Sequence, residues 1–350
     1  MKMEKHDHTF HYAKQFPLEA GGSLAGFQLK YTTLGKLNHD RSNIVWVCHA
    51  LTGSSDFTDW WGELFREGSV FDPREYFIIC ANMLGGCYGS TGPLSVDPET
   101  GKPFYHDFPL LTNRDIVRAF DLLRQELRID QIHTLTGGSL GGQQVIEWAV
   151  EKPEVFRYIV PMACNAFHSP WGIAFNEAQR MAIEADQSWK EDDIRAGSEG
   201  LKAARAIGMI SYRYYETFQQ TQSEKTDAKL DEFRASTYQR YQGQKLVNRF
   251  NAFTYWRLTK MMDSHNVGRD RISVKEALSQ ISAKTLVVGI DTDILFPVSE
   301  QKFLAENISG AQYVELNSLY GHDGFLVEFD QLDRVLKQFY FKKDTKKVLS

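Results

Sequence analysis

The apolar residues of this chain fall into two alternating patterns. Short, nearly continuous apolar runs are typical of buried strands, and they occur at residues 44–48, 76–80, 132–135, 158–162, 285–290 and 313–316. Elsewhere apolar residues recur at the spacing of a helix face, as at residues 116–127 and 331–341. Buried strands that alternate with helices predict an α/β fold, with a mostly parallel central sheet and helices on both faces.

The alternation stops between residues 166 and 282. This stretch is compatible with helices, contains few strand-like runs, and is rich in Gln, Arg, Glu and aromatic residues. We interpret it as a helical lid inserted between two strands of the sheet. Residues 1–165 and 283–350 would then form the core domain.

The composition narrows the class of protein. A chain of 350 residues can bury a large core, and its 42% hydrophobic and 24% charged residues are ordinary for a globular protein. The net charge of −5 gives no reason to expect nucleic acid or an anionic membrane as a partner. No apolar run approaches the roughly 20 residues of a membrane span, and the polar residues 1–11 do not resemble a secretory signal.

Cysteine and histidine usage favours a cytoplasmic enzyme without disulfides or metal. Three of the four scattered cysteines lie in or directly after apolar runs, where buried free thiols are common; the four are Cys48, Cys80, Cys87 and Cys164. His6, His8 and His11 have no cysteine or acidic cluster to complete a metal site. We expect them to belong to a mobile N-terminal arm.

One motif indicates a catalytic serine. Residues 137–141 read Gly-Gly-Ser-Leu-Gly, directly after the apolar run 132–135 and before a helix-like run at 143–150. A G-x-S-x-G sequence between a strand and a helix is the nucleophile elbow of the α/β-hydrolase fold. The glycines leave room for a strained turn that presents Ser139 between the adjacent strand and helix.

A serine hydroxyl needs a base, and in this fold the acid and the histidine follow the serine along the chain. Asp293 follows the strand-like run 285–290, and His322 follows the run 313–316. Ser139, Asp293 and His322 therefore form the predicted triad at the carboxyl ends of the strands. Asp291 is the alternative acid, although a turn residue is the simpler interpretation of it.

The oxyanion of an acyl-transfer reaction needs two donors. The backbone N–H of Leu140, directly after the nucleophile, is the first candidate. The second should come from the loop at residues 49–53, which follows the first apolar run. We assign it to Leu51, with Thr52 as the alternative.

A glycine-rich loop at residues 85–93 could be taken for a phosphate cradle. It contains neither a Gly-Lys-Ser/Thr sequence nor G-x-G-x-x-G, so it matches neither the P-loop nor the dinucleotide pattern. We interpret it as a rigid loop beside the active site.

Several longer motifs point to one family. They are HALTG at 49–53, NMLGGC at 82–87, STGP at 90–93, GGSLGG at 137–142, DILFP at 293–297 and GHD at 321–323, with YQGQK at 241–245 and RF at 249–250 in the lid. Together they resemble the homoserine O-acetyltransferase family, in order, over roughly residues 8–340. This resemblance is far more specific than a shared elbow.

The resemblance implies an acyl-CoA-dependent L-homoserine O-acyltransferase of methionine biosynthesis, with Ser139 as the acylated nucleophile of a ping-pong cycle. Arg205 would bind the substrate carboxylate, accompanied by Tyr212, and Asp323 would bind the ammonium; Arg213 is a nearby alternative to Arg205. A guanidinium fork and a carboxylate are what an amino acid requires.

The resemblance also implies that acetyl-CoA is a co-substrate, that no bound cofactor is needed, and that the chain forms a homodimer through the lid. A succinyl donor and a serine acceptor remain open within the family. An esterase or thioesterase, with water as the acceptor, is the alternative outside it, because the triad alone does not distinguish transfer from hydrolysis.

Overall fold

The structure is a computed structural model that describes residues 4–341. Its centre is an eight-stranded sheet in the order β1-β4-β6-β5-β7-β8-β9-β10. From β6 to β10 neighbouring strands are parallel, while β1 and β4 pair antiparallel at one edge. The strands are β1 (Lys5–Tyr12), β4 (Phe27–Leu34), β5 (Ile44–Cys48), β6 (Phe77–Ala81), β7 (Ile132–Gly138), β8 (Phe156–Met162), β9 (Lys284–Ile290) and β10 (Gln312–Leu316), and a separate small sheet joins β2 (Phe16–Pro17) to β3 (Ser23–Leu24).

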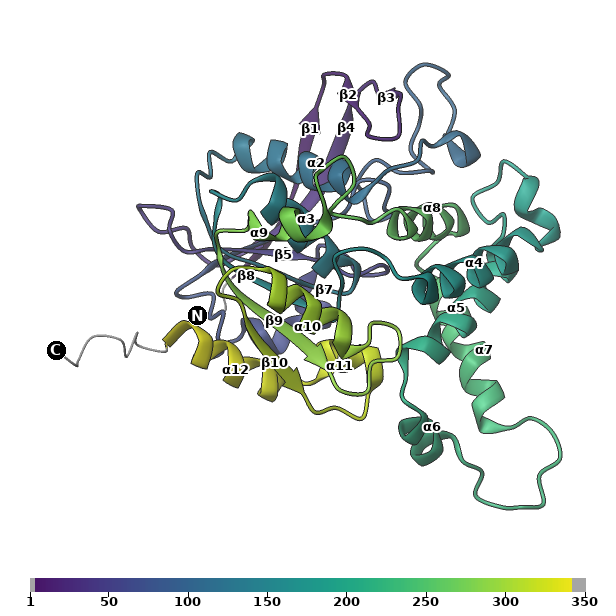
Figure 1. Ribbon diagram of the computed structural model, residues 1–350. Helices are drawn as coiled ribbons and strands as arrows, with labels where there is room; N and C mark the ends of the chain where they lie inside the picture. Colours follow the sequence, from purple (N-terminus) through teal and green to yellow (C-terminus); the bar gives the residue numbers. More distant parts are fainter. Residues whose placement is uncertain (1–3, 342–350) are drawn as a thin grey trace.

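Helices cover both faces of the sheet (Figure 1). Side chains of β5 alternate between two cores: Trp46 and Cys48 pack with α2, α3, α9 and α10, whereas Val45 and Val47 pack with α1 and α12. These helices are α1 (Phe57–Trp61), α2 (Asn113–Glu126), α3 (Leu140–Glu151), α9 (Val274–Ser279), α10 (Val298–Asn307) and α12 (Phe329–Phe341). The predicted mostly parallel sheet with helices on both faces is confirmed.

The N-terminal prediction was wrong. Residues 5–12 are not a mobile arm but strand β1, paired residue by residue with β4 from Lys5 opposite Leu34 to Tyr12 opposite Phe27. Most side chains of this edge strand are exposed, with Phe10 the buried exception. An edge strand exposed in this way lacks the apolar alternation by which a half-buried strand is recognised.

Helices also fill the chain between β8 and β9. They are α4 (Pro170–Glu184), α5 (Ser198–Tyr212), α6 (Tyr215–Gln222), α7 (Arg234–Val247), α8 (Ala252–Asp263) and α9. Helix α4 packs on α5 and α8, and α5 packs on α7, whereas α9 packs on α3 and α10. Figure 1 shows α4, α5, α7 and α8 together on one side of the sheet, with α6 and the loop after it projecting.

No helix among residues 4–341 combines the length and the apolar character that a membrane crossing would require.

Candidate active site

Ser139 occupies a strained turn between strand β7 and helix α3. Strand β7 ends at Gly138 and α3 begins at Leu140, while Ser139 between them has φ 58° and ψ −127°. Its N–H donates to the carbonyl of Met162 at 3.0 Å, and its carbonyl accepts from the N–H of Gln143 at 3.0 Å. A non-glycine residue with positive φ persists only where its surroundings fix it, and these two hydrogen bonds do so.

The glycines beside Ser139 are required by close contacts. A Cβ on Gly141 would lie 2.1 Å from the carbonyl oxygen of Cys48, at the end of β5. A Cβ on Gly138 would lie 2.3 Å from the ring of Phe325. The first turn of α3 therefore lies directly against the end of the neighbouring strand, which is possible only without side chains.

His322 and Asp293 form the second part of the predicted triad. Nδ1 of His322 lies 2.7 Å from Oδ2 of Asp293, and the two residues are 3% and 5% exposed. The other carboxylate oxygen of Asp293 accepts from the N–H groups of Leu295 at 2.8 Å and Phe296 at 2.9 Å. Those bonds fix the carboxylate, which in turn fixes the imidazole, so Nε2 of His322 is left to act on a proton.

Asp291 has other partners. Its carboxylate accepts from Asn317 Nδ2 at 2.7 Å and from the N–H of Ser318 at 2.9 Å. It thereby ties the end of β9 to the segment after β10. Of the two candidate acids, only Asp293 has a hydrogen bond to His322 within the described residues.

The pKa of His322 is raised above its ordinary value. Burial alone would lower it, but the charge and the hydrogen bond of Asp293 outweigh the cost of burial. The ring also stacks on Phe296, with centroids 5.1 Å apart. A histidine held in this way is a stronger base than a free one.

The loop after β5 presents the candidate oxyanion donors. The carbonyl of Ala50 lies 2.9 Å from Nδ1 of His49 and accepts from the N–H of Gly53 at 2.9 Å. In a trans peptide the N–H of Leu51 points away from that carbonyl, and it has no hydrogen-bond partner among residues 4–341. Leu140 is the first residue of α3, so its N–H has no partner within the helix.

His49 is a residue whose contribution the sequence did not reveal. Its Nε2 accepts from the N–H of Met83 at 3.1 Å, so the proton lies on Nδ1 and is donated to Ala50. Burial lowers the pKa of His49 to about 4, which keeps the ring neutral. The sequence signals were its position directly after a predicted strand and its place in the motif at residues 49–53.

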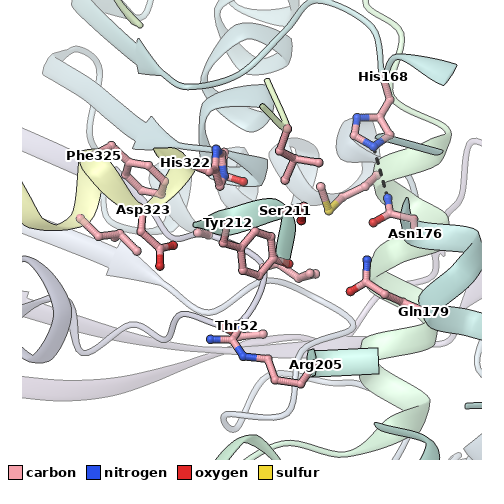
Figure 2. A pocket seen from close by; sticks show the side chains of 16 residues that line it. Thr52, His168, Asn176, Gln179, Arg205, Ser211, Tyr212, His322, Asp323 and Phe325 are labelled. Atoms are coloured by element: carbon pink, nitrogen blue, oxygen red, sulfur yellow. Dashed lines mark hydrogen bonds between the residues drawn. The ribbon is translucent and has the colours of Figure 1, made fainter. Parts of the chain in front are cut away.

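A single cavity collects the predicted residues. Its volume is about 80 Å³, room for several water molecules or a small amino acid. The predicted residues that line it are Leu51, Ser139, Arg205, Tyr212, His322 and Asp323, and the alternative donor Thr52 lines it too. Leu140 is buried beside it. Figure 2 shows His322, Asp323 and Phe325 at one end and the lid side chains at the other.

Arg205 and Arg213 have different surroundings. Arg205 lines the cavity, its guanidinium lies 5.4 Å from the centre of the Tyr212 ring, and it forms no ion pair within the described residues. Nε of Arg213 lies 3.3 Å from Oδ2 of Asp323, and Arg213 lines a different cavity beside α6. Burial raises the pKa of Asp323, although the positive charge of Arg213 opposes this effect.

Other cavity residues come from the lid and were not predicted. They are His168, Asn176, Gln179 and Ser211. His168 Nε2 lies 3.2 Å from Asn176 Nδ2 (Figure 2), and burial lowers the pKa of His168 to about 3. These residues belong to no motif, so only the packing of α4 and α5 reveals them. Among residues 4–341, no group of three or more His, Cys, Asp or Glu side chains is arranged to hold a metal ion.

Comparison with known proteins assigns the chain to a family. Residues 43–329 match the family model described as alpha/beta hydrolase fold. The chain is 50% identical over 344 residues to the homoserine O-acetyltransferase of Cyclobacterium marinum, with 98% of each protein covered. The chain belongs to the homoserine O-acetyltransferase family. The family resemblance of the sequence motifs is thereby confirmed.

Solved structures agree on the fold of this family member. Homoserine O-acetyltransferase from Staphylococcus aureus is 29% identical, with a TM-score of 0.82 over 98% of both chains. Esterase E22 is 22% identical, with a TM-score of 0.87 over 96% of this chain and 100% of the esterase chain. The second match shows the fold alone, so the fold does not separate acyl transfer from ester hydrolysis.

The Asp293–His322 contact makes a prediction about titration. In Asp293→Asn the carboxylate charge is lost while the burial of the ring remains, so we expect the pKa of His322 to fall by at least about one unit. Measurement of the imidazole nitrogens by NMR across the pH range checks this shift.

Asp291→Asn is the matched control, because Asp291 lies after the same strand but bonds to Asn317 and Ser318. In Asp291→Asn the pKa of His322 should be the same as in the unmodified protein. A fall in Asp291→Asn but not in Asp293→Asn would show that the wrong acid has been assigned.

Proposed function

We propose that this chain is an L-homoserine O-acetyltransferase that uses acetyl-CoA as its donor, in methionine biosynthesis. One observation carries the proposal: a small cavity contains Ser139 and His322 together with the cation of Arg205 and the carboxylate of Asp323. The first pair suits acyl transfer, and the second suits the carboxylate and ammonium of an amino acid. The 50% identity to a protein named for this activity supports both the acetyl donor and the homoserine acceptor.

In the first half-reaction His322 takes the proton of the Ser139 hydroxyl as the oxygen attacks the thioester carbonyl of acetyl-CoA. The N–H groups of Leu51 and Leu140 stabilise the negative oxygen of the tetrahedral intermediate. The C–S bond then breaks, and His322 returns its proton to the departing CoA sulfur. Ser139 is left as an acetyl ester, and Asp293 stabilises the imidazolium throughout.

In the second half-reaction the hydroxyl of homoserine attacks the acetyl ester. His322 takes the proton of that hydroxyl, and the same two N–H groups stabilise the second intermediate. The bond between the acetyl carbon and Ser139 Oγ breaks, and His322 protonates the serine oxygen. The products are O-acetylhomoserine and the free enzyme.

Substrate orientation would depend on charges of opposite sign. Arg205 has no ion-pair partner among residues 4–341 and can form a forked pair with the substrate carboxylate. Asp323 keeps Arg213 as its partner and has a second carboxylate oxygen for the ammonium. Arg213 therefore helps to keep Asp323 ionised although it is buried.

Hydrolysis is the competing outcome at the acetyl-enzyme. The alcohol must outcompete water, which favours a small, covered site that the amino acid fills. The volume of about 80 Å³ and the residues that α4 and α5 contribute to the lining support transfer over hydrolysis.

We also propose that the enzyme needs no metal or bound organic cofactor, because every step above uses protein groups. A cytoplasmic location is part of the proposal. The four cysteines are unpaired, as is usual in a reducing compartment. Cell fractionation with antibody detection tests the location, and an unchanged rate in EDTA tests the independence from metal.

The activity test measures free thiol released from acetyl-CoA and from succinyl-CoA, with L-homoserine, L-serine or no acceptor. Beyond the single equivalent of CoA that acetylation of Ser139 releases, we expect continued release only with acetyl-CoA and homoserine together. Ser139→Ala should lose activity by more than about 10⁴-fold while its thermal unfolding midpoint stays within a few degrees. Equal release without any acceptor would make the protein a hydrolase.

The role of Arg205 makes a separate prediction. Arg205→Ala should raise the KM for homoserine by about 10- to 100-fold, because a charge-assisted pair with the substrate carboxylate is lost. The rate of Ser139 acetylation, followed as the burst of CoA in single turnover, should change little. Arg205→Lys keeps the charge but loses the fork and should be intermediate. An unchanged homoserine KM in Arg205→Ala would move the assignment to Arg213.

We further propose a homodimer formed through the lid. Helix α6 and the loop that joins it to α7 project from the body (Figure 1). Exposed apolar side chains lie on α6, this loop and α7, including Tyr215 at 70%, Leu230 at 91% and Tyr241 at 59%. Sedimentation should give a dimer, and Tyr241→Glu should give a monomer. Val96→Glu is the control, since Val96 is 60% exposed outside the lid. A monomeric unmodified protein would contradict the proposal.

A further inference from the structure

The cavity at Ser139 is too small for the whole donor. A volume of about 80 Å³ does not accommodate the nucleotide end of CoA with its phosphates. If the proposed function is correct, those phosphates must bind at a second place that the thioester arm can reach from Ser139.

A second cavity lies beside the glycine-rich loop that the sequence analysis left without a role. It has a volume of about 650 Å³, within the range of ligand pockets. One wall is the loop, which contributes Gly86, Gly89 and Ser90, and the opposite wall includes residues 247–251. The loop is folded tightly on itself, because a Cβ on Gly92 would lie 2.2 Å from the carbonyl oxygen of Gly86.

The charges of this cavity suit an anion. Arg195 and Arg249 line it, no Asp or Glu does, and neither arginine forms an ion pair within residues 4–341. Two arginines without an ion-pair partner give this cavity a positive charge.

Two of the other cavities suit an anion less well. A cavity of about 790 Å³ beside β1 is lined by Asp97, Glu99 and Asp107, which would repel phosphate. The cavity of about 200 Å³ beside α6 contains Arg213, which is already paired with Asp323.

One contact joins the basic cavity to the active site. Nη1 of Arg249 donates to the carbonyl of Thr52 at 2.7 Å and also to the hydroxyl of Tyr88. Thr52 lines the cavity at Ser139 and directly follows Leu51, the proposed oxyanion donor. Nη2 of Arg249 also lies 3.5 Å from Oγ1 of Thr52, whereas its Nε–H has no hydrogen-bond partner within the described residues. Arg249 thus lies in the wall between the two cavities.

We propose that the cavity between the glycine-rich loop and residues 247–254 binds phosphate groups, and that Arg195 and Arg249 hold the phosphates of the acyl-CoA donor there. The assignment to CoA rests on the proposed function. The basic character of the cavity is independent of that function.

Arg195 is the residue to change, because it is exposed and its side chain has no partner among the described residues, whereas Arg249 also supports the oxyanion loop. Two donors are compared: acetyl-CoA, and S-acetylpantetheine, which lacks the nucleotide and its phosphates. Arg195→Glu should lower kcat/KM for acetyl-CoA about tenfold relative to kcat/KM for S-acetylpantetheine. Arg334→Ala, which removes an exposed arginine on α12, should leave that ratio unchanged.

Equal loss with both donors, or no change in the ratio, would overturn the proposal.

Calorimetric titration with CoA and with inorganic phosphate tests the anion site separately from the proposed function. Weaker CoA binding in Arg195→Glu supports the anion site even if acetyl-CoA is not turned over. If acetyl-CoA is turned over but neither CoA nor phosphate binding depends on Arg195, the anion site is wrong and the function stands. Phosphate binding that depends on Arg195, without such dependence for CoA, would overturn the assignment to the donor.

Discussion

The contact between the first turn of α3 and the end of β5 is the constraint on which the site depends. Gly141 lies so close to the carbonyl of Cys48 that no side chain fits between them. This approach brings the strained Ser139 beside the loop that begins at His49, so the nucleophile and both candidate oxyanion donors come from two adjoining segments. The buried, neutral His49 then orients the Ala50–Leu51 peptide. Nucleophile and oxyanion site are therefore parts of one rigid unit, as electrostatic preorganisation requires.

A second close approach couples the histidine to the lid. Gly321, with φ 62°, lies against the lid backbone, and a Cβ there would be 3.0 Å from the carbonyl oxygen of Tyr212. The next residue is His322, and Tyr212 ends α5, the helix that carries Arg205. A shift of α5 would therefore move the base and the amino-acid site together. Such coupling suits an enzyme whose lid must position the acceptor relative to the acetyl-enzyme.

How well the sequence predicted each feature depends on whether the interactions behind that feature are local in the chain. Buried apolar runs and the elbow are local patterns; with the order of serine, acid and histidine they predicted the six strands β5 to β10 and the residues around Ser139, but not strands β1 and β4. Asp291 and Asp293 follow the same strand; the sequence favoured Asp293, partly on the family resemblance, and the hydrogen bond to His322 supports that choice. Strand β1 was missed because its polar side chains are exposed at the edge of the sheet. His168 and Asn176 reach the cavity only through helix packing, which no motif records.

The sizes of the two cavities help to explain how an enzyme of this fold could transfer an acyl group to an alcohol while its acyl-enzyme is protected from hydrolysis. Esterase E22 shares the fold, so the sheet and the elbow do not exclude water. A reacting cavity of about 80 Å³ leaves little space for a water molecule once the acetyl group and the acceptor are bound. That small volume is compatible with a large donor only if the phosphates bind elsewhere. A separate basic cavity would supply binding energy far from the thioester while the reacting cavity stays small. Arg249 and Thr52 would then separate the cavity that recognises the donor from the cavity that excludes water.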